Sequence, residues 1–453
     1  EEGVMLLLSA HYDSYFNGFQ DDNAAAAMVL GIARTLIRSG YKPRKTILFA
    51  ALAAEEWGIT NSKYDWSAGA YQQVFVTRPQ WQGTVMADFN FELPARAHGR
   101  KDAVRSVYEY TTFLKDAVQD IPVDPKAYPE GLEIRCPIET MSDDFSMAIA
   151  GIPSMVNDFT EGPFMETHYH SQFDNETYYE EAVYRFHHLL YGTLVRKFDQ
   201  TALPPLDFSV LFAAMEHSLD LQFSETVSRA AQDAAGRLLE TARQAKQLGK
   251  EVYAWICGIN QRYAALLDAG QFQEATEFAG RWEKERAALL KAFRKGQDSF
   301  VRLNWHDEVF FPQETVRLNL LNLREAKRCL EQNDSRGALE AIYQIDNNRY
   351  AFQFDEEVFN YFTDYVFCQP KERLQWGAGR IVHHENLFHL VRSLKNREPR
   401  PETDFREELR ILTRVENNQK ACYESDLVYM IRETEYIMKI LKESLWTAIH
   451  CTE

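Results

Sequence analysis

The stretch VMLLLSAHYDSYFNGFQDDN, residues 4–23, decides the fold. Its apolar run, residues 4–8, predicts a fully buried strand. The strand ends in His11 and Asp13, and a short loop then carries an Asp-Asp pair ahead of an alanine-rich segment. Open α/β sheets bind their ligands at the carboxyl ends of the strands. We therefore expect this strand to deliver an imidazole and carboxylates to such an edge.

Further apolar runs extend this pattern along the first 200 residues. Buried strands are predicted at residues 45–54, 83–91 and 152–156, and helices at residues 24–38, 104–118 and 180–198. A helix joins the first two strands, and both strands are apolar throughout, which implies a parallel sheet covered on both faces. We therefore predict an α/β fold with a mostly parallel, doubly wound sheet.

The second half of the chain has a different character. From about residue 207, apolar residues recur at three-to-four spacing, and strand-like alternation is scarce. Helical patterns occupy residues 271–293, 314–330, 335–345 and 404–443. The sequence LPPL at residues 203–206 marks the expected boundary. We predict a catalytic α/β domain at residues 1–203 and a mostly α-helical domain at residues 204–453.

Composition narrows the classes of function. A chain of 453 residues exceeds the usual size of one core, and its net charge of −17 argues against nucleic acid as a partner. No run approaches the roughly 18 apolar residues of a membrane span. Six scattered cysteines without a CxxC pair favour a reducing compartment such as the cytoplasm. Because Glu1 lies so close to the first strand, we expect a trimmed N-terminus, which leaves a secreted or extracytoplasmic destination open.

Polar side chains follow each apolar run. They are His11 and Asp13, then Glu55 and Glu56, then Asp88, Asn90 and Glu92, and finally His168 and His170. Carboxylates at the end of a buried strand must be paired, hydrogen-bonded or metal-bound. Mixed nitrogen and oxygen ligands suit zinc first. Two cations bridged by one carboxylate would activate a water and polarise a peptide carbonyl. Of two adjacent glutamates, one can bind metal while the other acts as general base.

Several of these motifs together resemble the M28 zinc exopeptidases. They are SAHYDS at residues 9–14, DDNAAAAMVLGIAR at residues 21–34, LAAEEWG at residues 52–58, SD at 142–143, GIP at 151–153, and YHS at 169–171 followed by Asp174. The likeness covers roughly residues 4–200, in the order of the family. That family includes aminopeptidases, glutamate carboxypeptidase, the catalytically silent transferrin receptor and, as relatives, glutaminyl cyclases.

The resemblance implies a two-zinc site. His11 would ligate one zinc, and Asp13 would orient the His11 ring. Asp21 would bridge both ions, because aligning it with the family's Asp-x-x-Ser-Gly motif needs no gap. Asp22 is the alternative bridge and needs a one-residue deletion.

The resemblance also assigns the catalytic residues. Glu55 would be the general base, and Glu56 and His170 would hold the second zinc. Tyr169 would donate a hydrogen bond to the developing oxyanion. His168 is interpreted as an exposed loop histidine.

One departure from the family concerns the His11 site. The family's third strand ends in Asn-x-Asp, with the aspartate as ligand, and we align Asp88-Phe89-Asn90 with it. Asn90 would then ligate the first zinc without contributing charge. Three outcomes are open: two zincs of which one is labile, a single zinc held by Asp21, Glu56 and His170, or recruitment of Asp88 by a shifted register. The last requires the strand to exchange its faces, which a buried strand resists.

We accordingly predict a metal-dependent exopeptidase, an aminopeptidase acting on peptides through a zinc-activated water with Glu55 as general base. A catalytically silent binding or assembly protein is the alternative that Asn90 favours, and a one-zinc enzyme like glutaminyl cyclase is a third. Larger family members carry a helical dimerisation domain whose start resembles residues 203–209. A homodimer through the helical region is therefore expected.

Overall fold

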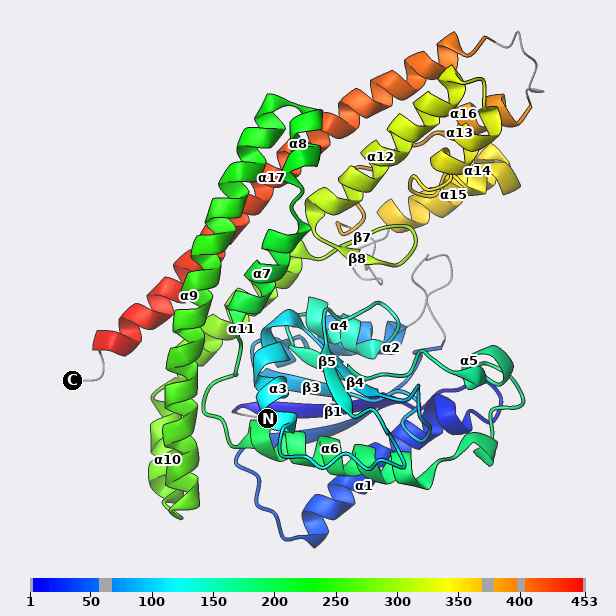
Figure 1. Cartoon of the computed structure of the whole chain (residues 1–453). Helices are drawn as coiled ribbons and strands as arrows, with labels where there is room; N and C mark the ends of the chain where they lie inside the picture. The colour runs from blue at the N-terminus through cyan, green and yellow to red at the C-terminus, as the bar shows by residue number, and fades with distance from the viewer. Residues whose placement is uncertain (1–2, 57–66, 369–378, 397–403, 451–453) are drawn as a thin grey trace.

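The computed structural model describes residues 3–56, 67–368, 379–396 and 404–450. A six-stranded sheet with helices on both faces forms the N-terminal part, and a long helical region stands on one side of it (Figure 1). Trp57 and Gly58, which end the motif that contains the two glutamates, lie outside the described residues.

The sheet has the strand order β2-β1-β3-β6-β4-β5. Its strands are β1 (Met5–His11), β2 (Thr46–Leu52), β3 (Val85–Asn90), β4 (Asp102–Ser106), β5 (Leu132–Arg135) and β6 (Ser154–Asn157). All neighbours pair in parallel except β4 with β6. The predicted mostly parallel sheet is confirmed.

Alternate residues of β1 face two different helical layers, as the two-residue period of a strand requires. Residues 6, 8 and 10 join the apolar cluster of α1 and α6, whereas residues 5 and 7 join that of α2 and α4. Figure 1 shows α1 and α6 on one side of the sheet and α2 and α4 on the other. The helices of this part are α1 (Ala25–Arg38), α2 (Ala68–Gln72), α3 (Thr111–Val118), α4 (Asp143–Ile149), α5 (Pro163–Thr167) and α6 (Glu181–Asp199). Shorter turns are η1 (Phe19–Ala24), η2 (Gln73–Thr77), η3 (Pro79–Trp81), η4 (Tyr108–Tyr110) and η5 (Glu176–Tyr178).

Two predictions about individual elements are wrong. The helix predicted at residues 104–118 is instead β4, the turn η4 and the shorter helix α3. Val104 pairs with both β5 and β6, and a short apolar run does not distinguish a buried strand from a buried helix. β2 was predicted to be buried, but it lies at the edge of the sheet among the described strands, and Phe49 is exposed.

The second half is mostly helical, as predicted. Its helices are α7 (Phe208–Ser218), α8 (Leu221–Val227), α9 (Arg229–Asp268), α10 (Phe272–Gly280), α11 (Glu283–Phe300), α12 (Pro312–Glu331), α13 (Ser335–Ile342), α14 (Tyr350–Gln353), α15 (Glu356–Phe367), α16 (Phe388–Lys395) and α17 (Arg406–His450). A hairpin of β7 (Arg302–Leu303) and β8 (Val309–Phe310) interrupts them. The long helices α9 and α17 pack against each other (Figure 1). No described helix is long and apolar enough to cross a membrane.

The segment at the predicted domain boundary is hydrogen-bonded to α9 through one side chain. The amide oxygen of Asn260 accepts hydrogen bonds from the backbone N–H groups of Ala202 and Leu203 at 2.9 Å, and its nitrogen donates to Leu203 O at 3.0 Å. One apolar core also runs without interruption from Leu6 of β1 to Leu441 of α17. The helical region therefore packs directly on the sheet-containing part. The division into two domains and self-association through the helices both stay predictions.

Candidate metal centre

The carboxyl end of β1 delivers His11, which is 1% exposed, into a ring of carboxylates. The Nδ1 atom of His11 is 2.9 Å from the backbone oxygen of Asp13. A carbonyl oxygen only accepts hydrogen bonds, so Nδ1 carries the proton and Nε2 is the free, ligand-type nitrogen. Four carboxylate oxygens surround Nε2, at 3.2 Å (Asp21), 3.4 Å (Glu92), 3.8 Å (Asp22) and 4.0 Å (Glu55).

Asp21 lies between the two histidines of the predicted site. One of its oxygens is 3.2 Å from His11 Nε2, and the other is 3.2 Å from His170 Nε2. His170 Nε2 is also 3.1 Å from Glu56 Oε2. Two groups of possible ligands therefore share Asp21: His11, Asp21, Asp22 and Glu92 form one, and Asp21, Glu56 and His170 form the other. Burial tends to raise the pKa of Asp21, but the close approach of both histidines outweighs it and lowers the pKa to about 2.

The loop that carries Asp21 is held by Asp174. The carboxylate of Asp174 accepts hydrogen bonds from the backbone N–H groups of Gln20 at 2.9 Å and Asp21 at 3.0 Å. Asp174 lies more than 150 positions further along the chain, so this contact ties the last motif of the α/β part to the first. The arrangement fixes the backbone of Asp21 independently of its side chain.

Asp13 differs in detail from the prediction. Its backbone carbonyl, rather than its carboxylate, lies closest to the His11 ring; the nearest carboxylate oxygen is 3.7 Å from Nδ1. The carboxylate instead accepts hydrogen bonds from the backbone N–H groups of Glu55 and Glu56, at 3.2 Å each. Asp13 thus joins the end of β1 to the pair of glutamates that follows β2.

The side chain of Asn90, predicted as a ligand of the His11 site, is engaged by two serines. Its amide nitrogen donates to Ser142 Oγ at 2.5 Å, and its amide oxygen accepts from Ser9 Oγ at 3.2 Å. In the sheet Asn90 pairs with Ser9, two residues before His11. Glu92, two residues beyond Asn90, takes the place beside His11, and its other oxygen accepts a 2.5 Å hydrogen bond from Ser142.

The expectation that recruiting Asp88 would require β3 to exchange its faces is wrong. Ser9 Oγ donates to Asp88 at 2.8 Å and also lies 3.2 Å from Asn90. Asp88, Asn90 and Glu92 therefore share one face, because every second residue of an extended chain points the same way. A shift of two residues leaves the buried face unchanged.

Glu55 and Tyr169 lie beside these groups. Glu55 is buried, and its Oε1 accepts a hydrogen bond from Ser67 Oγ at 3.3 Å. Burial raises the pKa of Glu55 well above its usual value; His11 opposes this, whereas Glu92 and Asp143 add to it. Tyr169 stacks on His170 with ring centroids 3.7 Å apart. Burial, followed by the charges of Asp21, Glu55 and Glu56, raises the pKa of Tyr169, so its hydroxyl is protonated near neutral pH.

His168 remains outside both groups. Its Nδ1 lies 2.7 Å from Thr167 Oγ1, and its ring packs against Phe164 and Tyr178. His168 therefore lies outside the site, as interpreted, but it is half-buried rather than exposed.

The donor set fits a divalent cation. Several buried atoms of the cluster have no hydrogen-bond partner among the described residues: His11 Nε2, Asp21 Oδ2, Asp22 Oδ2 and Glu56 Oε1. Buried carboxylates without partners are costly, and a cation between them would remove that cost. Imidazole nitrogens mixed with carboxylate oxygens are the ligands that zinc prefers when thiolates are absent.

Residues 1–191 match the family model of Peptidase family M28. The N-terminal part of the chain is therefore similar to that family. The match runs from β1 into α6 and includes every residue of both ligand groups. The resemblance expected from the motifs is confirmed.

Solved structures similar to this chain include two aminopeptidases. BSAP, a zinc aminopeptidase from Bacillus subtilis, is 20% identical with a TM-score of 0.36, over 43% of this chain and 46% of that one. The LapA aminopeptidase of Legionella pneumophila is 18% identical with a TM-score of 0.34, over 43% and 51%. A glutaminyl cyclase from an Acidobacteriales bacterium is 16% identical with a TM-score of 0.36, over 44% and 71%. The chain spans about half the length of the two aminopeptidases.

Proposed function

We propose that this protein is a zinc-dependent aminopeptidase. One observation carries the proposal: a single buried carboxylate, Asp21, lies 3.2 Å from the ligand-type nitrogens of both His11 and His170. Each histidine has a further carboxylate of its own within 3.4 Å, Glu92 at the first and Glu56 at the second. Such a shared carboxylate is what a pair of adjacent divalent cations requires.

In this proposal His11, Asp21 and Glu92 hold one zinc, with Asp22 as a further oxygen nearby. Asp21, Glu56 and His170 hold the other. Bound zinc would lower the pKa of a water molecule and polarise a substrate carbonyl. Asp13 and Asp174 position the ligands, because they hold the backbone of Glu55, Glu56 and Asp21.

Glu55 is proposed as the general base. It follows β2 directly, is buried, and is oriented by Ser67 on one oxygen while the other oxygen faces the metal groups. It would take a proton from the attacking water and return it to the amine that leaves the cleaved peptide bond. A carboxyl whose pKa is raised by burial holds that proton more readily than an exposed one.

Tyr169 is proposed to stabilise the oxyanion. Its hydroxyl is kept protonated beside the carboxylates, so it remains a hydrogen-bond donor. A donor held in place before the reaction stabilises developing negative charge without reorganisation.

The charge of the cluster favours an amino terminus as the recognised group. Two zinc ions would balance the charges of Asp21, Asp22, Glu56 and Glu92, and Glu55 and Asp143 would remain as further buried carboxylates. An ammonium group is attracted by such an acidic surrounding, whereas a free carboxylate is repelled.

Two adjacent substitutions test this assignment. Glu55→Gln should leave the zinc content unchanged and lower kcat/KM for aminoacyl p-nitroanilides by about 10²–10⁴-fold, because a general base typically contributes that much. Glu56→Gln, its matched control, should lose zinc as well as activity. Zinc is measured by inductively coupled plasma mass spectrometry on both purified variants.

Three results would contradict the proposal, and each leads to a different conclusion. Wild-type protein that binds zinc but cleaves no aminoacyl substrate would indicate a silent binding protein. Cyclisation of N-terminal glutaminyl peptides in preference to hydrolysis would indicate a cyclase. Full activity of Glu55→Gln would remove Glu55 from the mechanism.

A further inference from the structure

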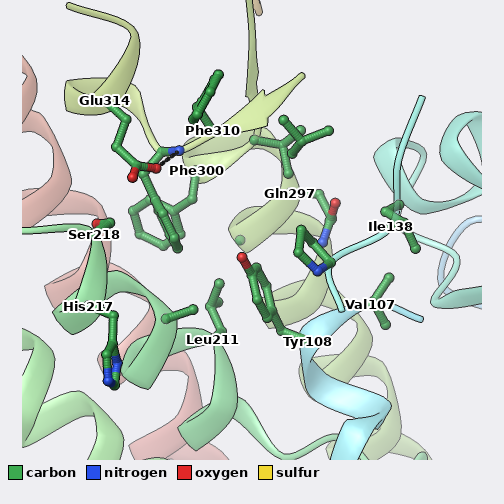
Figure 2. Close-up of a pocket in the computed structure, with 16 residues that line it drawn as sticks. Val107, Tyr108, Ile138, Leu211, His217, Ser218, Gln297, Phe300, Phe310 and Glu314 are labelled. Carbon is green, nitrogen blue, oxygen red and sulfur yellow. Dashed lines mark hydrogen bonds between the residues drawn. The ribbon is translucent and has the colours of Figure 1, made fainter. Parts of the chain in front are cut away.

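The interior of the protein is filled differently in two places. Where the sheet-containing part meets the helical region, mainly apolar side chains such as Leu211 and Phe300 surround a cavity of about 320 Å³ (Figure 2). A few residues after Glu92, the interior instead holds a charged side chain, that of Arg96, which is 2% exposed. Burial lowers the pKa of Arg96 to about 10, so its guanidinium stays charged near neutral pH. A buried charge is costly unless it is hydrogen-bonded, so the contacts of this guanidinium indicate what it stabilises.

On one side, the guanidinium of Arg96 contacts the segment that follows β3. Its Nη1 is 2.8 Å from His98 Nδ1, and His98 Nε2 is 3.0 Å from the backbone oxygen of Leu93. Because a carbonyl oxygen only accepts, His98 Nε2 carries the proton, and Nδ1 accepts from Arg96. Burial, followed by the charge of Arg96, lowers the pKa of His98 to about 3, so this imidazole is neutral. Leu93 directly follows Glu92, the proposed ligand of the first zinc.

On the other side, the guanidinium contacts the segment that follows β6. Its Nη2 donates to the backbone oxygen of Glu161 at 2.6 Å, and the group lies over the ring of Phe164, 4.8 Å from the centroid. Gly162, between these two residues, has a φ of +98°, and a Cβ atom added there would lie 2.7 Å from Nη2. The guanidinium therefore packs directly against the backbone of this segment.

The contacts of Phe164 lead on to the second ligand group. Its backbone oxygen accepts hydrogen bonds from the N–H groups of His168 at 2.8 Å and Tyr169 at 3.0 Å. Phe164 and Leu93 belong to one small apolar cluster, and Tyr169 packs against it. Tyr169 in turn stacks on His170. The position of Phe164 therefore influences where Tyr169 and His170 lie.

The two ligand groups differ in their other supports. The backbone N–H of Glu92 donates to Asn157 Oδ1 at 3.0 Å, and its carboxylate accepts from Ser142. The side chain of His170 is 38% exposed, and its φ is +53°. Residues other than glycine keep such a backbone conformation only where their surroundings impose it. We therefore expect His170 to depend on Arg96 more strongly than Glu92 does.

We propose that Arg96 is a positioning residue for the second zinc site. Through its contacts on both sides, it holds the segment that carries His170 against the segment that carries Glu92. The inference rests on the proposed two-zinc site, and Arg96 itself contacts neither zinc nor substrate. Loss of the guanidinium should weaken the zinc bound by His170 and spare the zinc bound by His11.

Zinc titrations of the metal-free protein, in competition with a chromophoric chelator, test this role. Wild-type protein should bind two zinc ions. Arg96→Met removes both hydrogen-bond donors and should weaken one zinc by about 10- to 100-fold, as loss of a residue outside the ligand shell does at other zinc sites. The affinity of the other zinc should not change.

Two further variants of arginine complete the series. Arg96→Lys keeps the charge, but one ammonium group does not replace the two arms that reach Glu161 and His98, so the same zinc should be weakened to a smaller degree. Arg100→Met is the matched control, because Arg100 lies in the same segment and its side chain is 72% exposed. It should bind both zinc ions as wild type does.

A double-mutant cycle identifies the zinc that depends on Arg96. His170→Ala removes a ligand of the second site. If Arg96 acts through His170, adding Arg96→Met to His170→Ala should leave the remaining zinc unchanged. A general loss of structure would instead weaken the remaining zinc as well. Circular dichroism and melting temperature establish which variants fold, and Arg96→Lys replaces Arg96→Met in the cycle if the latter does not.

The titration needs no substrate, so its outcome is separate from the enzymatic activity. Wild-type protein that binds two zinc ions but cleaves no aminoacyl substrate would refute the proposed function and leave the role of Arg96 to the titration. A folded Arg96 variant that binds both zinc ions as wild type does, or that weakens both equally, would overturn this inference and leave the proposed function intact. Wild-type protein that binds fewer than two zinc ions would overturn the inference as well.

Discussion

The buried carboxyl of Glu109 makes the stability of the protein depend on pH. Glu109 lies in η4 and is 0% exposed, and neither of its carboxyl oxygens has a hydrogen-bond partner among the described residues. It faces the helical region, since a Cβ atom added at Gly296 of α11 would lie 3.9 Å from its Oε1. Burial, with a smaller contribution from Asp207, raises the pKa of Glu109 to about 8.

The sign of the effect follows from the direction of this shift. Below the usual pKa of 4.5, Glu109 is protonated in both the folded and the unfolded chain. As the pH rises through 4.5 and towards 8, the unfolded chain releases its proton while the folded chain keeps it. The free energy of unfolding therefore falls over this window. At about 1.4 kcal/mol per pKa unit, a change from 4.5 to about 8 corresponds to roughly 5 kcal/mol at most.

Glu109→Gln removes the ionisation but keeps the shape. The variant should gain stability relative to wild type by several kcal/mol between pH 5 and pH 9, with most of the gain reached at the alkaline end. Calorimetric melting temperatures of both proteins, measured across this range after chelation, provide the comparison. The difference between the two proteins cancels the carboxylates that they share.

An exposed glutamate supplies the control. Glu225→Gln on α8 lies at the surface and should follow wild type at every pH. A difference between Glu109→Gln and wild type that stays constant from pH 5 to pH 9 would refute the reasoning. It would mean that Glu109 is already ionised in the folded protein.

Two further predictions concern the metal centre. Glu92→Gln should weaken zinc binding by at least about 10- to 100-fold in chelator competition, because loss of a carboxylate outside the ligand shell already costs that much at other zinc sites and Glu92 is a proposed direct ligand. Asp88→Asn, on the same face of β3, should leave zinc binding unchanged. Equal effects of the two substitutions would contradict the assignment of Glu92 rather than Asp88 as the ligand. Asp174→Asn should lower kcat/KM about tenfold at saturating zinc, because the backbone N–H groups of Gln20 and Asp21 lose their carboxylate acceptor. An unchanged kcat/KM would show that the loop needs no such support.

The motifs at the ends of β1 and β2 were predictable because they are local. His11 is the last residue of a seven-residue buried strand, and Glu55 and Glu56 follow another apolar run, so the strand pattern alone places them at one edge. The contact between Asp21 and His170 was expected only from the resemblance, because local sequence patterns do not predict contacts between residues so far apart in the chain.

The preference for Glu92 over Asn90 as the proposed ligand has a physical cause that lies in the sequence. Alternation along an extended chain puts Asp88, Asn90 and Glu92 on one face, so the choice among them depends on how far β3 extends past β1. That register is set by pairing of Met5 with Val85 and a shift in the pairing immediately after it. A bulge cannot be read from apolar periodicity, yet Glu92 satisfies the same alternation and carries the charge that Asn90 lacks.

The contacts around Ser142 give the helical region a physical connection to the proposed site. Thr140 Oγ1 donates to the backbone oxygen of Asp307, in the turn between β7 and β8, at 2.8 Å. Two residues later, Ser142 holds Glu92 and Asn90. Displacing the hairpin would therefore disturb the segment that orients a proposed zinc ligand. The helical region therefore contacts the segment that orients the proposed zinc ligand Glu92.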